Sequence, residues 1–436
     1  MAQKRFPQAL AARMRELPLW YGRHRVLAWI CLVIAVNQLG FGSIVPVVPL
    51  YAAAYGVPQF LIGLTIAVYG LARFAASIPA GWLADLAGRR WSLATGGVMT
   101  AAGNAICGLA PTYEVFLLGR FVAGSGAAMV LTSGQVILAD ITSPETRGRT
   151  MSFYMAVFLF AVGIGPLPGG LLAELGGLAL PFYSYAALGS VVALLALWRV
   201  PETRPATRYH VEGLHHQTPY LSQVVALFSQ RPFLLVSLLS FASFFARTGA
   251  LFTLVPLRAQ HEIGLDPAQI GLGLALISIL GLLGAYPSGL LVDTLGRKAV
   301  IVPSTLLTSA GLVGFAVAPN YGWFLLACLL WALASGISGA APAAYAADVA
   351  PSGRNAAAMS TYRMLAESGY VVGPALLGWL SDLTGTTDTL EATAVLVVLT
   401  GAVFALFAPE TYRSRGSRHG QSPGRMVRLG EKRGGD

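Results

Sequence analysis

Twelve long apolar runs, separated by short polar segments, constrain the fold of this chain more than any other feature. The runs occupy residues 26–54, 60–84, 92–110, 114–139, 151–174, 181–198, 233–257, 269–292, 299–318, 322–347, 358–381 and 390–408. A helix of about 20 residues crosses the roughly 30 Å hydrocarbon core of a bilayer. Because the runs are continuous and do not alternate at every second residue, they predict membrane-spanning helices and not the strands of a membrane barrel.

Composition supports the same fold class. Hydrophobic residues make up 55% of the chain and charged residues only 11%, so most side chains face an apolar solvent and a soluble domain is nearly excluded. Cys31, Cys107 and Cys328 all lie inside the runs, where they indicate packing and neither a disulfide framework nor a metal site. The sequence has no phosphate-binding loop of the type G-x-x-x-x-G-K-[ST], and it indicates no cofactor.

The positive charges predict how the chain is oriented. Of the 29 Lys and Arg residues, 24 lie before the first run, in every second loop, or after the last run. The positive-inside rule therefore places both termini in the cytoplasm, which requires an even number of spans. The expected location is the cytoplasmic (inner) membrane, and the net charge of +10 is explained without nucleic acid as a partner.

An internal repeat divides the runs into two halves. Adding 208 to the residue numbers carries residues 81–90, GWLADLAGRR, to residues 289–298, GLLVDTLGRK, and residues 201–203 to residues 409–411. Each half contains six runs, an even number, so the two halves have the same orientation in the membrane. Such parallel repeats are related by an axis along the membrane normal and enclose a cavity at their interface.

This organisation predicts an all-α integral membrane protein with twelve transmembrane helices in two parallel-related six-helix bundles. The expected segments are a basic cytoplasmic N-terminus, the first bundle, a cytoplasmic linker, the second bundle and a basic disordered tail, at residues 1–25, 26–198, 199–232, 233–409 and 410–436. The basic tail is interpreted as a lipid-facing segment.

Three motifs resemble those of one known family. GWLADLAGRR and its second copy resemble the loop motif of the major facilitator superfamily. The segment LLGRFVAGSGAA, residues 117–128, is similar to the family's intramembrane arginine motif, and GPLPGG, residues 165–170, to the motif of its drug/proton antiporters. The resemblance covers the whole membrane region and implies a transporter that works by alternating access.

The two charged turns predict a gate at the cytoplasmic end. Asp85 and Asp293 each end a helix, where the helix dipole disfavours a carboxylate, so each requires an arginine or a helix N-terminus as partner. The glycines before them would allow close helix approach, and the glycines after them would permit tight turns. The expected gate residues are Gly81, Asp85, Gly88, Arg89, Arg90, Asp140, Arg147, Gly289, Asp293, Gly296 and Arg297. A loop whose charges serve only topology is the alternative.

The GPLPGG segment predicts a bend in the fifth span. Its prolines remove backbone donors, and its glycines let a neighbouring helix pack closely. The resemblance implies that Gly165, Pro166, Gly169 and Gly170 form a rigid helix contact that favours exchange over symport. A generic membrane kink is the alternative.

Charges inside the spans point to proton coupling, because each is costly unless it is paired or reaches water. Glu367 is the one acid placed deep inside a span, and Arg363 precedes it by four residues on the same helix face. Burial favours the neutral acid and Arg363 favours the charged one, so Glu367 could bind a proton in one state and release it in another. A fixed ion pair is the alternative. The resemblance implies that Arg120 assists proton transfer.

Polar and aromatic side chains within the spans are candidates for lining a substrate cavity. They are Asn37, Gln38, Arg73, Gln135, Tyr154, Phe244, Arg247 and Tyr362. Aromatic residues in spans more often pack than bind ligands. Arg73 and Arg247 could be structural residues bonded to backbone carbonyls, or they could form an anion site.

The leading functional hypothesis is proton-coupled efflux of drug-like or amphipathic small molecules. Its partners are the substrate, protons and the bilayer, and we expect a monomer. No enzymatic activity is expected, because no nucleophile, base and orienting group can be assembled from the polar residues of the spans. The alternative is a proton-coupled or exchange transporter of a small anionic metabolite, using Arg73, Arg120 and Arg247. A receptor on the same fold would need a large soluble domain, for which the linker and tail are too short.

Overall fold

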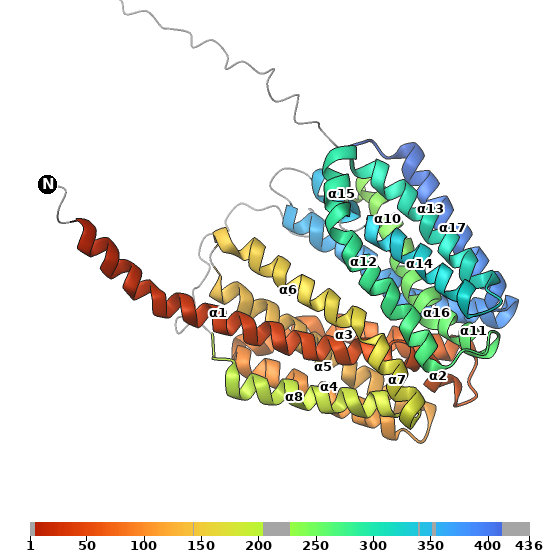
Figure 1. The fold of residues 1–436 in the computed structure, drawn as a ribbon, viewed down its shortest axis with the longest axis horizontal. Coiled ribbons are helices and arrows are strands. Elements are labelled where there is room, and N and C mark those ends of the chain that lie inside the picture. Colours follow the sequence, from red (N-terminus) through yellow and green to blue (C-terminus); the bar gives the residue numbers. More distant parts are fainter. Residues whose placement is uncertain (1–4, 143, 204–226, 339–340, 351–354, 412–436) are drawn as a thin grey trace, which may run out of the picture.

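The described part of the chain is helical and divides into two groups of helices. The computed structural model describes residues 5–142, 144–203, 227–338, 341–350 and 355–411, and no strand occurs among them. Most of the expected linker and tail therefore lies outside the described residues. We call the helices between residues 5 and 199 the N bundle and those between residues 231 and 407 the C bundle. Figure 1 shows the N bundle in red to yellow-green and the C bundle in green to blue.

Within the described residues, each bundle contributes six membrane-crossing units. The N bundle consists of α1 (Arg5–Ile44), α2 (Val47–Ala53), α3 (Gln59–Ala87), α4 (Arg89–Leu109), α5 (Tyr113–Ile141), α6 (Pro144–Ile164), α7 (Pro166–Gly176) and α8 (Leu180–Arg199). The C bundle consists of α10 (Arg231–Phe245), η1 (Ala246–Leu254), α11 (Val255–His261), α12 (Pro267–Leu295), α13 (Arg297–Val317), α14 (Tyr321–Ser338), α15 (Ala341–Asp348), α16 (Asn355–Thr384) and α17 (Thr386–Phe407). Units made of consecutive segments are α1 with α2, α6 with α7, α10 with η1 and α11, and α14 with α15. The predicted twelve-helix architecture is confirmed.

Two of the twelve units are less apolar than the others. Ten described helices are long and apolar enough to cross a membrane by composition alone. The other two units are α4, which begins with Arg89 and Arg90, and α16, which carries Arg363 and Glu367. Charges are tolerated at helix ends and where a helix faces protein or water, so these two helices are the ones to examine for polar contacts.

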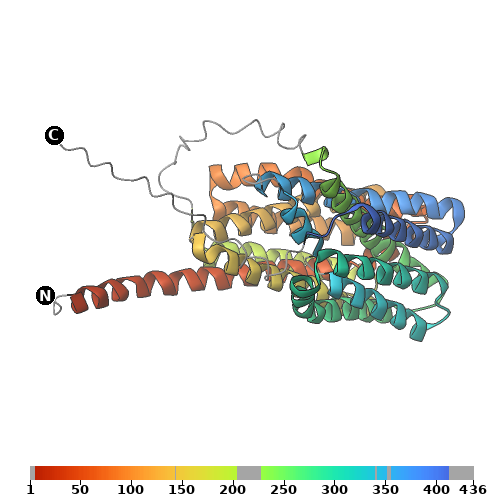
Figure 2. The ribbon, with the colours of Figure 1, turned by 90° about the horizontal axis from the view of Figure 1, so that it is seen from above.

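Several units depart from a straight helix. α6 ends at Ile164 and α7 begins at Pro166, so the fifth unit is interrupted at Gly165. The first unit is interrupted before Pro46, which caps α2. In the seventh unit, η1 is a π-helical stretch, a wider form that often occurs at functional sites. No sequence pattern indicated it. α1 also begins far ahead of the expected span, and Figure 2 shows it extending beyond the rest of its bundle.

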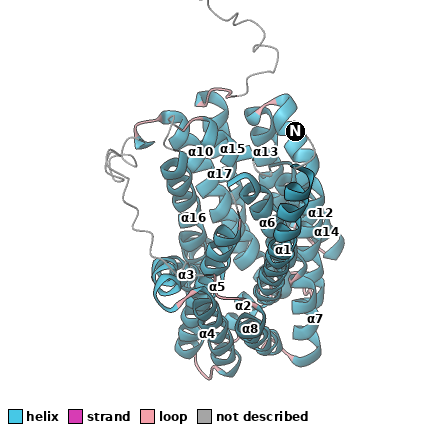
Figure 3. Ribbon diagram, turned by 90° about the vertical axis from the view of Figure 1, so that its left-hand side faces the viewer, coloured by secondary structure: helices cyan, strands magenta, loops and turns pink. Residues whose placement is uncertain are grey.

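The helix contacts of one bundle repeat in the other. α4 packs against α5 and α8, and α13 packs against α14 and α17 in the same way. α3 packs on α5 as α12 packs on α14. Figure 3 shows α3, α4, α5 and α8 on one side of the molecule and α10, α13, α15 and α17 on the other. The internal sequence repeat is therefore a repeat of structure.

The bundles meet along α3 with α16 and along α6 and α7 with α12. We call the end that carries Arg89 and Arg297 the basic end, and the other the opposite end. α2 and α11 contact each other at the opposite end, where Figure 1 shows the bundles closest together. A side chain added at Gly63 of α3 would overlap the backbone of Pro374 in α16. Because glycine has no side chain, the backbones of the two bundles approach each other closely at this position.

Candidate functional site

A tight turn between α3 and α4 starts the first polar site at the basic end. α3 ends at Ala87 and α4 begins at Arg89, with Gly88 between them at a φ of 102°. That φ disfavours every residue with a side chain, so the turn requires glycine. It brings the guanidinium of Arg89 back over the end of α3, where Nη1 donates to the carbonyl oxygen of Ala84 at 3.0 Å.

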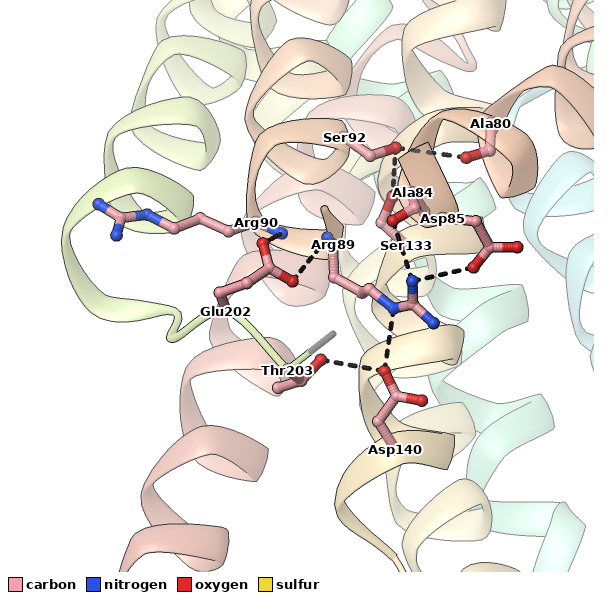
Figure 4. A network of polar contacts seen from close by, with 10 residues as sticks. All are labelled: Ala80, Ala84, Asp85, Arg89, Arg90, Ser92, Ser133, Asp140, Glu202 and Thr203. Atoms are coloured by element: carbon pink, nitrogen blue, oxygen red, sulfur yellow. Dashed lines mark hydrogen bonds and ion pairs between the residues drawn. The ribbon is translucent and has the colours of Figure 1, made fainter. Parts of the chain in front are cut away.

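Arg89 is the centre of a polar group that we call the Arg89 cluster, formed by Asp85, Arg89, Asp140, Glu202 and Thr203 (Figure 4). Nη1 of Arg89 is 2.9 Å from Oδ1 of Asp85, and Nε donates to Oδ2 of Asp140 at 3.1 Å. The hydroxyl of Thr203 donates to the same oxygen of Asp140 at 3.1 Å. The cluster therefore ties α3, α4 and α5 to the segment after α8. It gives Asp85 the cationic partner that a carboxylate at a helix C-terminus requires.

Glu202 caps the start of α4. Its two carboxylate oxygens accept hydrogen bonds from the backbone N–H groups of Arg89 at 2.9 Å and Arg90 at 3.2 Å. The first N–H groups of a helix have no partner within the helix, and the helix dipole favours negative charge there. Glu202 is not among the expected gate residues, although the repeat of residues 201–203 at 409–411 marks it in the sequence.

The C bundle holds a second copy, which we call the Arg297 cluster. Gly296, at a φ of 100°, makes the turn, and Nε of Arg297 donates to Oδ2 of Asp348 at 3.0 Å. The carboxylate of Glu410 accepts from the backbone N–H groups of Arg297 and Lys298, each at 3.1 Å. Each of these contacts has a counterpart 208 residues earlier, so the two clusters are structural repeats.

The other expected gate residues are placed differently. In the described structure, a Cβ added at Gly81 would meet nothing within 4 Å. The expected close helix approach at Gly81 is therefore absent, because α3 faces open space there. The surroundings of Gly289 and the side chains of Arg147 and Asp293 lie outside the described residues. The described contacts of each cluster lie within one bundle, so they fix the helices of that bundle.

At the opposite end, one carboxylate joins the two bundles. Asp382, near the end of α16, accepts hydrogen bonds from the backbone N–H groups of Gln59 and Phe60 at the start of α3, each at 2.8 Å. The side chain of Gln59 also donates to Oγ1 of Thr386 at 3.4 Å. The dipole of α3 stabilises the negative charge of Asp382. This contact links residues 323 positions apart, and no local sequence pattern indicates it.

The GPLPGG motif makes close backbone contacts toward the opposite end. A Cβ added at Gly165 or Gly169 would overlap the backbone of α1 in the same bundle. A Cβ added at Gly170 would overlap the first turn of α12 in the C bundle. Pro166 is the first residue of α7, a position where its missing N–H costs nothing. The motif therefore packs the fifth unit against its own bundle and against the partner bundle.

The charged pair Arg363 and Glu367 lies inside α16. Nε of Arg363 donates to Oε1 of Glu367 at 3.0 Å. The side chain of Arg363 is 65% exposed and that of Glu367 29%. Charged side chains within a span avoid lipid, so we infer that this exposed surface faces water between the bundles. Arg363 is nearer to Asn355, at the basic end of α16, than to Thr384, so this exposed surface lies toward the basic end.

Three further arginines lie inside the spans without a carboxylate partner in the described part of the chain. The guanidinium carbons of Arg73, Arg120 and Arg247 lie over aromatic rings, at 5.3, 4.3 and 5.8 Å from the ring centroids. Nε of Arg120 also donates to the carbonyl oxygen of Thr65 at 3.2 Å, while its buried Nη1 has no hydrogen-bond partner. Unpaired charges within a membrane are by default candidates for a functional site.

The remaining candidates for lining the cavity differ in whether their polar atoms have hydrogen-bond partners. They are Asn37, Gln38, Gln135, Tyr154, Phe244 and Tyr362. Nδ2 of Asn37 donates to Oε1 of Gln38 at 2.9 Å, and the hydroxyls of Tyr362 and Ser240 are 2.8 Å apart. The buried hydroxyl of Tyr154 and Oδ1 of Asn37 have no hydrogen-bond partner. Gln135 is partly buried, and the ring of Phe244 is 37% exposed.

An apolar groove of about 400 Å³ runs along the seam between α3 and α16. Its lining is apolar throughout and includes Leu71 and Trp379, both half exposed. Arg73 and Tyr370 lie on other faces of the same two helices. The groove therefore faces the lipid and is separate from the charged interior.

Comparison with known proteins places the chain in a family. The model of the Major Facilitator Superfamily matches residues 30–261 and 236–430. Multidrug resistance protein 2 of Bacillus subtilis is 25% identical over 371 residues, which cover 84% of this chain and 91% of that protein. An uncharacterized MFS-type transporter of Methanocaldococcus jannaschii is 25% identical over 373 residues, covering 84% of this chain and 94% of that protein.

Among solved structures, the chain is similar to a bacterial homologue of the human lysosomal transporter Spinster in an inward-facing and occupied conformation. The TM-score is 0.74 at 17% sequence identity, over 88% of this chain and 96% of that chain. At this identity the likeness concerns the fold. With the family model matching both bundles, the chain belongs to the major facilitator superfamily and is a multi-pass membrane transporter, not an enzyme.

Proposed function

We propose that this protein exports drug-like or amphipathic small molecules from the cytoplasm in exchange for protons, as a monomer in the cytoplasmic membrane. In this proposal the basic end and both termini lie in the cytoplasm, because Lys and Arg concentrate there. The observation that carries the proposal is an asymmetry. The bundles are in contact at the opposite end, while charged side chains toward the basic end are exposed, which supports one state of alternating access.

Two contacts support closure of the opposite end. Asp382 of the C bundle caps α3 of the N bundle, and the backbone of Gly170 meets α12. Near the basic end, the exposed pair Arg363 and Glu367 supports an open entrance. In the proposed orientation this conformation receives substrate from the cytoplasm. Rotation of one bundle against the other would break the contacts at the opposite end and open that side.

Glu367 is the proposed proton carrier. It lies twelve residues after Asn355 and seventeen before Thr384 (367 − 355 and 384 − 367), deeper in its span than any other described acid. Arg363 stabilises the charged carboxylate, whereas closure of the cavity around it would stabilise the protonated form. The buried Nη1 of Arg120 has no hydrogen-bond partner in the described structure, which supports the proposal that Arg120 assists the proton.

The gate residues keep their proposed role in a modified form. The Arg89 and Arg297 clusters hold the cytoplasmic end of each bundle as a unit, so that each bundle can move as a rigid body. Asp85 is exposed and lies at the end of α3. It is the member of its cluster that we propose contacts the C bundle when the cytoplasmic end closes.

Proton movement in proteoliposomes tests the proposal. Purified protein is reconstituted with a pH-sensitive dye inside, and ethidium, norfloxacin and fluorescein are added in turn as cationic, zwitterionic and anionic probes. We expect at least one probe to drive proton movement, and Glu367→Gln to abolish it. Glu391→Gln, which changes an exposed acid of α17, should leave proton movement unchanged. Probe transport that survives Glu367→Gln and ignores the pH gradient would overturn proton coupling.

A second candidate function is exchange of a small anionic metabolite. It is favoured by Arg73, Arg120 and Arg247, which lie over aromatic rings and have no carboxylate partner in the described chain. The drug-like class is supported instead by the name of the Bacillus subtilis relative, a multidrug resistance protein. Saturable exchange of organic anions that is indifferent to Glu367→Gln would favour the second candidate.

A further inference from the structure

We propose that the substrate of this transporter carries an anionic oxygen group, such as a carboxylate or sulfonate, which binds between Arg73 of the N bundle and Arg247 of the C bundle, beside Tyr370. The inference rests on the proposed transport function and names the chemistry of its substrate. It concerns one end of the substrate only, so the rest of the molecule can remain apolar.

The depth of the two arginines is the first reason. Arg73 lies fourteen residues from each end of α3, since 73 − 59 and 87 − 73 are both 14. Arg247 lies sixteen residues after Arg231 and fourteen before His261 in the seventh unit. At about 1.5 Å per residue, each charge is roughly 20 Å from either end of its unit, near the middle of the membrane. The free-energy cost of placing an arginine in the membrane is greatest at this depth. Packing alone does not explain an arginine here, because a shorter or apolar side chain could pack at lower cost.

The unused hydrogen-bonding capacity of the two side chains is the second reason. In the described structure, neither guanidinium donates a hydrogen bond to a protein acceptor, and neither forms an ion pair. Each lies over a ring, Arg73 over Tyr370 at 5.3 Å and Arg247 over Phe252 at 5.8 Å. A ring stabilises the charge through the face of the guanidinium but leaves the N–H groups at its edge free. Those N–H groups match the oxygens of a carboxylate or sulfonate.

Charge balance around Tyr370 is the third reason. The guanidinium of Arg73 lies 5.3 Å from the ring of Tyr370, and Oγ1 of Thr248, the residue after Arg247, donates to the carbonyl oxygen of Tyr370 at 3.4 Å. Glu367 is already paired with Arg363, so the remaining charges give this region a positive field. Such a field favours an anionic group and disfavours a cationic one. Arg120 is buried, and its Nε donates to the carbonyl oxygen of Thr65, so we do not place it in direct contact with the anion.

The local backbone keeps these groups in place. Gly70 of α3 makes room for the ring of Tyr370, since a Cβ at Gly70 would lie 2.8 Å from Cδ1 of that ring. Arg247 sits in the π-helical stretch η1, where Oγ1 of Thr253 donates to the carbonyl oxygen of Thr248, five residues back, at 2.8 Å. In this stretch the guanidinium of Arg247 lies over the ring of Phe252. One arginine thus comes from each bundle, so a bound anion would link the bundles during transport.

Binding to the intact protein in lipid nanodiscs, without a pH gradient, tests this inference. Three probes share a phenylbutyl body and differ only in head group: 5-phenylpentanoate, 4-phenyl-1-butanol and 4-phenylbutyltrimethylammonium. We expect the carboxylate alone to bind saturably, as measured by the rise in melting temperature. Arg73→Gln and Arg247→Gln should each weaken its binding about tenfold or more, as loss of a hydrogen bond to a charged group does.

A matched control is Arg199→Gln, because the guanidinium of Arg199 also lies 5.3 Å from a ring centroid, that of Trp29, but at a helix end. It should leave carboxylate binding unchanged, and Arg73→Lys should retain part of it. Equal binding of the ammonium probe by the wild-type protein would overturn the inference, and this comparison needs no variant. Unchanged carboxylate binding in both glutamine variants would overturn it too. Carboxylate binding without transport would instead count against the proposed function and leave the site standing.

Discussion

The Arg89 and Arg297 clusters are two copies of one hydrogen-bond pattern in different surroundings. The side chain of Arg89 is 10% exposed and that of Arg297 18%, and their partners Asp140 and Asp348 are 20% and 34% exposed. Each ion pair has nearly the same length, 3.1 and 3.0 Å. Because removal of one partner from a pair shielded from water leaves an uncompensated charge, equal distances here do not imply equal losses of stability when the arginine is removed.

The surroundings differ because the repeat has diverged beside the cluster. In the N bundle, Oγ of Ser133 donates to Oγ of Ser92 at 2.9 Å, and Ser92 donates to the carbonyl oxygen of Ala80 at 3.4 Å. The equivalent positions in the C bundle are Val300 and Ala341, which cannot form such a chain. The N bundle therefore joins α3, α4 and α5 by a chain of serines beside the cluster, whereas in the C bundle Ser288 of α12 donates to the carbonyl oxygen of Ile337 in α14 at 2.7 Å. We infer that the basic end of the N bundle is the more rigid of the two.

Removing the central arginine gives the largest expected effect. Arg89→Ala leaves the partly buried Asp140 without the cationic partner Arg89, which should lower the free energy of unfolding by about 3 kcal/mol. Arg297→Ala removes one partner of an ion pair that is more exposed to solvent. We expect it to lower the free energy of unfolding by about 1 kcal/mol. Melting temperatures in detergent, recorded for both variants, measure the difference.

Arg199→Ala is the control for this pair, because it removes an arginine at the end of α8 that belongs to neither cluster. Its melting temperature should stay close to that of the unaltered protein. Equal losses for Arg89→Ala and Arg297→Ala would contradict the inferred difference between the bundles.

Much of the fold could be predicted because the bilayer imposes a simple rule. Every span must be a helix of sufficient length, so the apolar runs gave the twelve units, and the offset of 208 gave their grouping. The interruptions were harder. GPLPGG marks the break at Gly165, but η1 contains no residue that favours a π-helix. That stretch depends on the packing of Gly249 against the backbone of Gly373, which is a tertiary contact.

The polar sites were predictable only where their residues are neighbours in sequence or in the repeat. Asp85 and Arg89 are four residues apart, and so are Arg363 and Glu367. Asp382 was missed because its partners are backbone N–H groups in the other bundle, and a backbone group leaves no trace in the sequence. The close helix approach expected at Gly81 is not made in the described structure, and a glycine in a helix does not show which helix approaches it or in which conformation.

Asp382 joins the two bundles, whereas the contacts of each cluster lie within one bundle. A change at Asp382 has an expected effect of intermediate size. Asp382→Asn replaces one acceptor oxygen by an amide donor and removes the charge at the start of α3. We expect it to weaken the cap by about 1.4 kcal/mol, which would shift the balance toward opening of the opposite end about tenfold. Spin labels at Ala54→Cys and Asp388→Cys, read by electron–electron distance measurement in nanodiscs, report this opening. The three native cysteines are buried.

The control for this variant is Glu114→Gln, in the first turn of α5 at the same end. It should leave the distance distribution unchanged. Arg297→Ala should lower stability without changing that distribution, since its described contacts lie inside the C bundle. A distribution that shifts equally in Arg297→Ala and Asp382→Asn would mean that the clusters, and not the cap alone, set the balance between the two conformations.

The smallest expected effect tests why the two clusters differ. Ser133→Ala gives the N bundle the residue that the C bundle has at Ala341 and leaves Ser92 without its donor. A loss of about 1 kcal/mol or less is expected for one neutral hydrogen bond. Ser125→Ala is the matched control, since among the described residues Oγ of Ser125 donates to the carbonyl oxygen of Phe121 in its own helix and to no other acceptor. In the Ser133→Ala background, Arg89→Ala should cost less than it does alone, because residues of one network are not additive. Full additivity of the two changes would show that the serine chain does not support the Arg89 cluster, and burial alone would then account for the greater rigidity of the N bundle.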